Sequence, residues 1–339
     1  MKTLLIGGNG NISWHCVQKA LEAGHEVWEL NRALTRKTRR GVQPEVRQII
    51  GDVRKNDEID AMLGDETFDA VCDFICYNGE QAAQDIRLFR ERAKQFIYIS
   101  SEAVYMRKSS SLPFPETAEQ YPSAVPDPYI AGKIQAERIF GSAYEKEGFP
   151  VTIVRPGYTY DTIVPSPVGQ NCFTAPQKYI SGYPLLMPGD GTNLWSPLHS
   201  RDFAEAFVPL LGNTGAIGED YHITHDTLIT WNELAEQLLA ALGTGKPRIL
   251  HIPYGDALRI NAFHSEIIKR QRMWHYIFDN SKIKKAAPGW AAKTSFRDGI
   301  AETVAWLYGD DARRRINQKY DAALEEIYGK FWTDRRETR

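Results

Sequence analysis

The sequence predicts an α/β protein with a Rossmann-type doubly wound parallel sheet and a smaller, loop-rich α/β lobe. Three observations support this fold class. Helical patterns separate most of a series of strand-like apolar runs at 2–6, 25–30, 46–50, 70–75, 95–99 and 151–155. A glycine-rich turn follows the first run. Beyond Pro156 the alternation gives way to a stretch rich in proline and glycine.

The amino-terminal segment combines a strand, a glycine-rich turn and a helix. Residues 1–6 form the buried strand, the helix is expected over 15–23, and the next strand follows at 25–30. The turn reads Gly7-Gly8-Asn9-Gly10-Asn11-Ile12-Ser13. This order directs backbone N–H groups and the positive end of a helix dipole toward a pyrophosphate. We therefore predict a dinucleotide site whose turn residues are Gly7, Gly10, Asn11 and Ile12.

Two further sequence segments indicate acid–base chemistry. Ser100-Ser101-Glu102-Ala103-Val104-Tyr105 follows the strand at 95–99 and places serine hydroxyls at its carboxyl end. Tyr129-Ile130-Ala131-Gly132-Lys133 opens a helix, on which positions i and i+4 share one face. An ammonium beside a phenol favours the phenolate, so we expect Lys133 to lower the pKa of Tyr129 from its usual value near 10. The alternative is an ordinary pair on the surface of the helix.

With these motifs the chain resembles the extended short-chain dehydrogenase/reductases, which include nucleotide-sugar epimerases and dehydratases. The resemblance covers roughly residues 1–308. Its motifs are the glycine turn with Ser13 in place of the last glycine, Gly51-Asp52-Val53-Arg54, Ser101 with Tyr129 and Lys133, Arg155-Pro156-Gly157-Tyr158-Thr159-Tyr160, Gly189-Asp190-Gly191, Trp231-Asn232-Glu233 and Asp279-Asn280-Ser281-Lys282-Ile283. The resemblance implies that Ser101, Tyr129 and Lys133 are catalytic. It also places Asp52, Val53, Phe74, Pro156 and Tyr158 along the dinucleotide, with Asp52 toward the adenine.

Glu102 bears on the type of reaction. Sugar 4,6-dehydratases of this family carry an Asp-Glu pair directly after the catalytic serine or threonine. This chain has Glu102-Ala103, which keeps only the first carboxylate and argues against a standard dehydratase. The sequence leaves an epimerase and a reductase open, with Glu102 as a candidate catalytic proton shuttle.

The end of the second strand bears on the choice of cofactor. NAD sites usually place an acidic residue there for the ribose 2′-hydroxyl, whereas an arginine accommodates a 2′-phosphate. Asn31 and Arg32 occupy this position, and Arg36 follows in the loop. An uncharged side chain beside guanidinium groups favours NADP. The alternative is NAD, with Glu29 or Asn31 holding the ribose.

Trp195 limits the prediction of substrate. Family members that act on nucleoside diphosphate sugars often place an arginine a few residues after Gly189-Asp190-Gly191, and that arginine grips the diphosphate. Here the position holds Trp195. A neutral indole cannot neutralise a diphosphate, although it could stack on a sugar or a base.

These features predict an NAD(P)-dependent enzyme that acts on a hydroxyl or keto group of a sugar or nucleotide sugar. Tyr129 takes the proton of a hydroxyl held by Ser101 while hydride passes to the nicotinamide. One such transfer makes a reductase, and two on opposite faces make an epimerase. Two rival functions are RNA binding, because the Asn31-Arg32 strand end is similar to that of chloroplast stem-loop RNA-binding proteins, and NADP sensing without turnover.

Composition excludes other classes. The net charge of −2 gives no basis for nucleic-acid or membrane binding, and no apolar run approaches the roughly 20 residues of a membrane span. The start Met1-Lys2-Thr3 leaves no room for a signal peptide, so a cytoplasmic location is expected. The four cysteines lack metal-ligand spacing, and no metal is expected. The resemblance implies a homodimer.

The 339 residues exceed what one compact core usually contains. We expect a dinucleotide-binding domain over 1–161, to which 199–225 return. The substrate-binding lobe is expected over 162–198 and 226–310, and a C-terminal helix and tail over 311–339.

Overall fold

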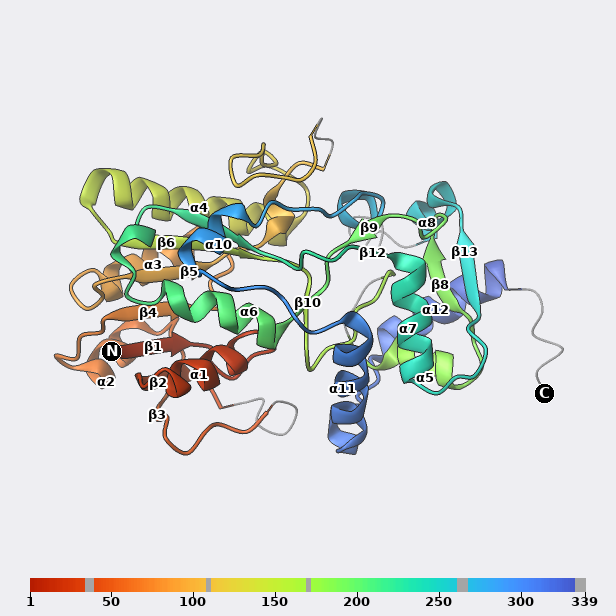
Figure 1. Cartoon of the computed structure of the whole chain (residues 1–339), viewed down its shortest axis with the longest axis horizontal. Coiled ribbons are helices and arrows are strands. Elements are labelled where there is room, and N and C mark those ends of the chain that lie inside the picture. The colour runs from red at the N-terminus through yellow and green to blue at the C-terminus, as the bar shows by residue number, and fades with distance from the viewer. Residues whose placement is uncertain (34–39, 108–110, 169–171, 261–267, 333–339) are drawn as a thin grey trace. The chain divides into compact units, whose positions relative to one another are not determined.

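The computed structural model describes residues 1–33, 40–107, 111–168, 172–260 and 268–332 (Figure 1). The chain forms two compact units. Unit 1 consists of Met1–Thr159, Ser200–Asp226 and Phe278–Lys293. Unit 2 consists of Tyr160–His199, Thr227–Ile277 and Thr294–Arg339.

Unit 1 contains a seven-stranded parallel sheet with the strand order β11-β6-β5-β4-β1-β2-β3. The strands are β1 (Lys2–Ile6), β2 (Glu26–Asn31), β3 (Arg47–Ile50), β4 (Ala70–Asp73), β5 (Phe96–Ile99), β6 (Val151–Pro156) and β11 (Asp220–Ile223). The central strands read as continuous apolar runs because helices cover both faces of a parallel sheet. The doubly wound fold predicted from the sequence is confirmed, and each predicted strand is present within about two residues of its expected bounds.

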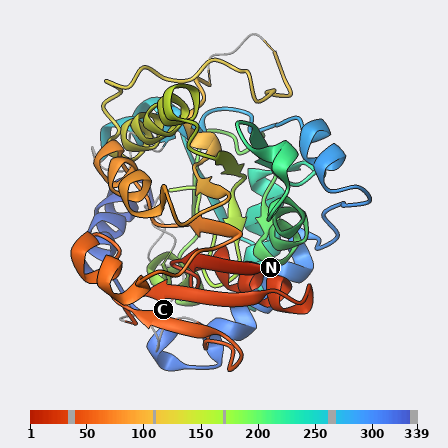
Figure 2. The ribbon, with the colours of Figure 1, turned by 90° about the vertical axis from the view of Figure 1, so that its left-hand side faces the viewer.

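Helices lie on both faces of this sheet (Figure 2). They are α1 (Ser13–Glu22), α2 (Asn56–Leu63), α3 (Gly79–Phe89), α4 (Pro128–Glu147), α6 (Ser200–Phe207) and α10 (Ser281–Ala286), with the 3-10 turns η2 (Glu102–Val104), η3 (Val208–Leu210) and η4 (Thr214–Ala216). Helix α3 packs against α4 on one face, and α1 packs against α6 on the other. On the α3/α4 face, Phe96 is fully buried among Phe89, Phe140 and Phe149.

Unit 2 is built from short paired strands and helices. Its strands are β8 (Leu185–Pro188) parallel to β13 (Ile249–Ile252), and β9 (Leu194–Trp195) antiparallel to β12 (Ile229–Thr230). Two more short strands are β10 (Leu198–His199) and β7 (Thr159–Tyr160), whose first residue belongs to unit 1. Its helices are α5 (Thr174–Ile180), α7 (Trp231–Ala241), α8 (Tyr254–Ile260), α11 (Phe296–Tyr308) and α12 (Gln318–Phe331), with a π turn η5 (Ile268–Arg272) and a 3-10 turn η6 (Asp311–Arg313). Thr230 and Glu233 cap α7 reciprocally.

The unit boundaries differ from the expected ones at two places. Residues 278–293, expected in the substrate lobe, belong to unit 1, where the Asn280 side chain bonds both backbone groups of Thr224. Helix α12, expected as a separate tail, belongs to unit 2, where Lys178 pairs with Asp321 and Glu325. Such docking depends on contacts between distant segments, which local sequence patterns do not reveal. Every helix in the described ranges is too short or too polar to cross a bilayer.

Candidate active site

The predicted site residues of unit 1 lie at the carboxyl ends of its parallel strands. This edge of a doubly wound sheet is where ligands bind, beside the point at which the strand order reverses. In this sheet the reversal falls between β1 and β4. The turn after β1, the end of β2, the turn after β4 and the segment after β5 therefore meet in one region.

The glycine-rich turn forms a close cradle. Gly7 has a φ of +77°, and a Cβ on Gly8 would lie 2.7 Å from Cγ of Glu29. Ser13, which replaces the last glycine of the family motif, closes the turn: its hydroxyl donates to the carbonyl of Gly7 (2.6 Å) and accepts from the N–H of Gly10 (2.8 Å). Asn11 and Ile12 precede α1, and the apolar Ile12 side chain cannot cap its N–H groups. This cradle fits a pyrophosphate.

The end of β2 brings together Asn31, Arg32 and Asp52. The Asn31 amide donates to Oε2 of Glu29 (3.2 Å), and its oxygen accepts from the N–H of Ala33 (2.9 Å). Arg32 is exposed and lies 3.8 Å from Oδ2 of Asp52. Val53 is buried, so its side chain packs in the core. Arg36 lies outside the described residues.

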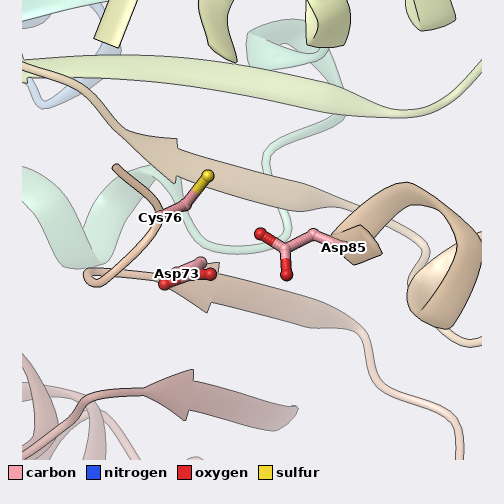
Figure 3. Close-up of side chains that lie close together, drawn as sticks. All are labelled: Asp73, Cys76 and Asp85. Carbon is pink, nitrogen blue, oxygen red and sulfur yellow. The ribbon is translucent and has the colours of Figure 1, made fainter. Parts of the chain in front are cut away.

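The turn after β4 is fixed by a buried cluster of polar groups (Figure 3). Oxygens of Asp73 and Asp85 and the sulfur of Cys76 lie within 4.8 Å of one another. Arg54 donates to Asp73 (2.8 Å) and to Asp85 (2.7 Å), so a guanidinium already supplies the positive charge that a metal ion would bring. Burial and the neighbouring Asp73 raise the pKa of Asp85 well above its usual range. The cluster is therefore a charge-balanced structural element.

Phe74, Pro156 and Tyr158 were expected along the dinucleotide. The Phe74 ring packs edge-on against Phe207 of α6, at 5.6 Å between centroids. Pro156 is buried as the last residue of β6, beside Ile223 of β11. Tyr158 is half-buried just beyond that strand end. These residues lie at strand ends of the same sheet, and their contact with a cofactor remains a prediction.

Helix α4 presents Tyr129 and Lys133. Asp127 caps the helix by accepting from the N–H groups of Tyr129 (2.9 Å) and Ile130 (3.1 Å), and Pro128 starts it. Tyr129 is 44% exposed, whereas Lys133 is 2% exposed. The Lys133 ammonium lies 5.9 Å from the centroid of the Tyr129 ring.

The Lys133 ammonium is directed at backbone carbonyls. It donates to the carbonyl of Cys76 (2.7 Å) and to the carbonyl of Ile99 (2.7 Å), and burial lowers its pKa to about 8. The pKa of Tyr129 is raised to about 12, because desolvation by burial outweighs the opposing effect of the Ser101 side chain. The expectation that the pKa of Tyr129 lies below its usual value near 10 is therefore wrong: in this structure the pKa lies above that value.

Ser101 and Glu102 lie beside Tyr129. Ser101 has an extended backbone, and its hydroxyl accepts from the N–H of Ala103 (3.2 Å). Its side chain is also close enough to Tyr129 to lower the pKa of that phenol. Glu102 is 3% exposed, and its carboxylate charge contributes to raising the pKa of Tyr129. The structure thus brings all four predicted catalytic residues together at the end of β5.

A second buried network, which sequence reasoning missed, joins α4 to β6. Arg155 makes two parallel bonds to Glu137 (2.9 and 2.8 Å) and one to Asp220 (2.6 Å). Glu137 also accepts from the hydroxyl of Ser100, and Arg155 donates to that of Tyr105. Glu137 follows Lys133 by four residues, and this helical spacing was the available signal.

The profile of the NAD dependent epimerase/dehydratase family matches residues 3–224, about two thirds of the chain. The protein belongs to this family. The resemblance drawn from the motifs is thereby confirmed.

Two relatives illustrate the range of proteins similar to this chain. The chloroplast stem-loop binding protein of 41 kDa b from Arabidopsis thaliana is 27% identical over 262 residues, which are 74% of this chain and 65% of the relative. A dTDP-glucose 4,6-dehydratase from Streptomyces niveus is 29% identical over 224 residues, which are 64% of this chain and 58% of the relative. The matches therefore cover less than two thirds of either relative.

Two solved structures share the fold of this chain. A dTDP-glucose 4,6-dehydratase from Bacillus anthracis, in complex with NAD, matches with a TM-score of 0.70 at 20% identity and covers 92% of this chain and 98% of its own. A UDP-glucuronic acid 4-epimerase from Bacillus cereus, in complex with UDP-glucuronic acid and NAD, matches with a TM-score of 0.70 at 17% identity and covers 91% and 99%. At these identities the comparison shows the fold alone.

Trp195, at the position where family members often carry an arginine, is packed inside unit 2. It is 1% exposed, and its ring stacks on Tyr276 at 4.1 Å between centroids and 8° between planes. The Arg272 guanidinium lies 4.7 Å from its centroid. Both neighbours are themselves nearly fully buried, so the alternative that Trp195 stacks on a sugar or a base is wrong.

Gly132, within the family's Tyr-x-x-x-Lys motif, provides a test of how closely α4 packs against the turn after β4. A Cβ at this position would lie 2.1 Å from the carbonyl oxygen of Tyr77. Helix propensity alone would make Gly132→Ala stabilising by about 1 kcal/mol. We expect the opposite sign, because the collision involves backbone and α4 must shift, and we expect Lys133 to lose its contact with Cys76.

Chemical denaturation measures the stability of this variant. Gly141→Ala in the same helix is the control, because nothing lies within 4 Å of a Cβ there, and it should stabilise by roughly 0.5–1 kcal/mol. Equal stabilisation by both substitutions would contradict the packing of α4 against the turn after β4.

Proposed function

We propose that the protein is an NAD(P)-dependent epimerase or reductase that acts on a hydroxyl or keto group of a sugar or nucleotide sugar. The observation that supports this is the juxtaposition of Ser101, Tyr129 and Lys133. The Ser101 side chain is close enough to the phenol of Tyr129 to lower its pKa, and Lys133 is anchored one helical turn away. This set lies at the same edge of the sheet as the glycine-rich turn.

In the proposed reaction, Ser101 orients the substrate hydroxyl and Tyr129 takes its proton. A nicotinamide bound in its oxidised form would accept the hydride, and its positive charge would favour the phenolate. Lys133, fixed by the carbonyls of Cys76 and Ile99, holds one end of α4 and adds positive charge on the same side. The glycine-rich turn and the start of α1 would hold the pyrophosphate.

The environment of Glu102 favours an epimerase or a reductase over a dehydratase. Elimination of water needs an acid and a base in addition to Tyr129. Glu102 is close enough to Tyr129 to affect its pKa, but the next residue is Ala103, which has no ionisable group to serve as the second acid or base. Glu102 alone is suited to moving a proton between the site and Tyr129.

The cofactor and the assembly belong to the same proposal. Arg32 and Asn31 support NADP, whereas the solved relatives named above are complexes with NAD. We also propose a homodimer, as the family resemblance implies. The apolar side chains Ile134 and Phe140 of α4 are fully buried within the subunit, so an interface would have to use other residues of α3 or α4.

Calorimetric titration with NAD and with NADP, followed by assays on dTDP- and UDP-sugars, tests the function. A reductase would change the absorbance of the reduced nicotinamide in proportion to product. An epimerase would convert sugar, as followed by NMR, with no net change in that absorbance. Absence of binding of both dinucleotides would overturn the proposal.

RNA binding is the second candidate, because a chloroplast stem-loop binding protein is among the relatives. A net charge of −2 opposes it, since phosphate contacts dominate affinity for RNA. Titration of a labelled stem-loop at several salt concentrations separates the two functions. Tight binding that weakens steeply with salt, without turnover of any sugar, would favour the RNA-binding function.

A further inference from the structure

A buried acid lies beneath the glycine-rich turn. Glu29 is in the middle of the core of unit 1, with no exposed surface, although it occupies a strand between two apolar residues, Trp28 and Leu30. A Cβ on Gly8 would lie 2.7 Å from Cγ and 2.9 Å from Oε1 of Glu29. The carboxyl group therefore supports the turn that the proposed function assigns to the pyrophosphate.

The two oxygens of Glu29 have different environments. Oε2 accepts the Asn31 amide at 3.2 Å, and Asn31 is at the position expected to face the ribose of the cofactor. Oε1 is buried and has no hydrogen-bond partner among the described residues. A fully buried carboxyl oxygen without a donor is costly when ionised. The arrangement suits a group that gains and loses a proton.

The surroundings of Glu29 contain little that would fix its charge. Its strand neighbours are Leu5 on β1 and Gln48 on β3, neither of which is charged. The nearby ion pair of Arg32 with Asp52 has no net charge. Helix α1, which packs on β2, carries His15 and Cys16 on its buried face. Burial raises the pKa of Glu29 to about 7, and the Asn31 amide opposes the shift.

We propose that Glu29 is a specificity-determining residue that acts through Asn31: its ionised form favours NAD and its neutral form admits NADP. This inference rests on the proposed function. Asn31 would lie between the Glu29 carboxylate and the ribose. When it is ionised, this carboxylate repels a 2′-phosphate on the ribose, because the phosphate is itself anionic. With a neutral carboxyl this repulsion is absent, and Arg32, exposed beside Asp52, can bind that phosphate. The choice between the two cofactors then depends on pH.

The test is the ratio of the affinities for NADP and NAD between pH 6 and pH 8, measured by calorimetry. For the native protein we expect NADP to lose about tenfold against NAD as the pH rises, as repulsion between two partly screened charges implies. Glu29→Gln keeps the size of the side chain and an oxygen for the Asn31 amide. In this variant the ratio should vary only through the titration of the 2′-phosphate itself.

A second readout does not require a cofactor. Because the pKa of Glu29 is raised in the folded state, the native protein binds this proton more tightly than the unfolded chain. Stability should therefore fall as the pH rises from about 4.5 to about 7, and Glu29→Gln should remove this part of the fall. This readout also shows whether the variant is folded.

The outcomes separate the two proposals. If neither dinucleotide binds the native protein, the proposed function fails. If both bind, and the ratio shows the same pH dependence in the native protein and in Glu29→Gln, the function stands and the role of Glu29 is overturned. An NADP-to-NAD affinity ratio that falls with rising pH in the native protein relative to the ratio in Glu29→Gln supports the role of Glu29.

Discussion

Tyr129→Phe is expected to reduce turnover by a factor of roughly 10²–10⁴, the usual contribution of a positioned acid–base group. The substitution removes only the hydroxyl of Tyr129, whose pKa the neighbouring Ser101 side chain affects. The ring is 44% exposed, so the loss of the hydroxyl should leave the stability of the fold almost unchanged. Steady-state kinetics on the substrate found by the assays above measures the effect, and calorimetry checks that dinucleotide affinity is retained.

Tyr144→Phe is the matched control, because Tyr144 is an exposed tyrosine of the same helix. It should leave turnover within a factor of about two. If Tyr129→Phe retained the native rate while the protein bound and converted its substrate, Tyr129 would not be the acid–base group. Retention of a biological effect by an inactive Tyr129→Phe variant would instead favour a cofactor sensor.

Arg155→Met is expected to lower the free energy of unfolding by about 3–5 kcal/mol, as when one partner of a buried ion pair is removed. Arg155 and Glu137 are 3% and 5% exposed, so Glu137 would keep a buried charge without its main counter-ion. Burial by itself would lower the pKa of Arg155, but the Glu137 carboxylate outweighs it, and the pKa is raised well above its usual value. Urea denaturation with a two-state fit measures the loss.

Two further variants isolate the cause of that loss. Glu137→Gln added to Arg155→Met removes the stranded charge and should restore part of the stability. Arg90→Met breaks an ion pair with Glu147 whose two side chains are each 45% exposed, and it should cost less than about 1 kcal/mol. If Arg155→Met cost no more than Arg90→Met, the buried network would not stabilise the protein.

The fold could be predicted from local patterns because strands buried on both faces are continuous apolar runs. Residues 199–225 were expected to return to the sheet domain, but β11 was not predicted as a strand there, and helix α10 was expected in the substrate lobe. Both elements are short, and their place depends on contacts such as those of Asn280 with Thr224. Length and hydrophobicity alone carry no information about such pairings.

The catalytic candidates could be selected because motif spacing places Ser101, Tyr129 and Lys133 on known elements. The direction of the Lys133 ammonium could not, because its two carbonyl partners come from other segments. The packing of Trp195 against Tyr276 likewise joins residues about eighty positions apart. Properties set by burial, such as the pKa of Tyr129, require the three-dimensional structure.

Ser100 and Ser101 are chemically identical neighbours with opposite surroundings. Ser100 donates to Glu137 in the buried network, whereas the Ser101 side chain is close enough to Tyr129 to affect its pKa. Side chains alternate along extended backbone, so this division depends only on position. Deleting Ser100 would leave Ser101 as the only serine of this segment, and one side chain cannot face both Glu137 and Tyr129. Variation in the length of this segment should therefore be far less tolerated than exchange of one serine for threonine.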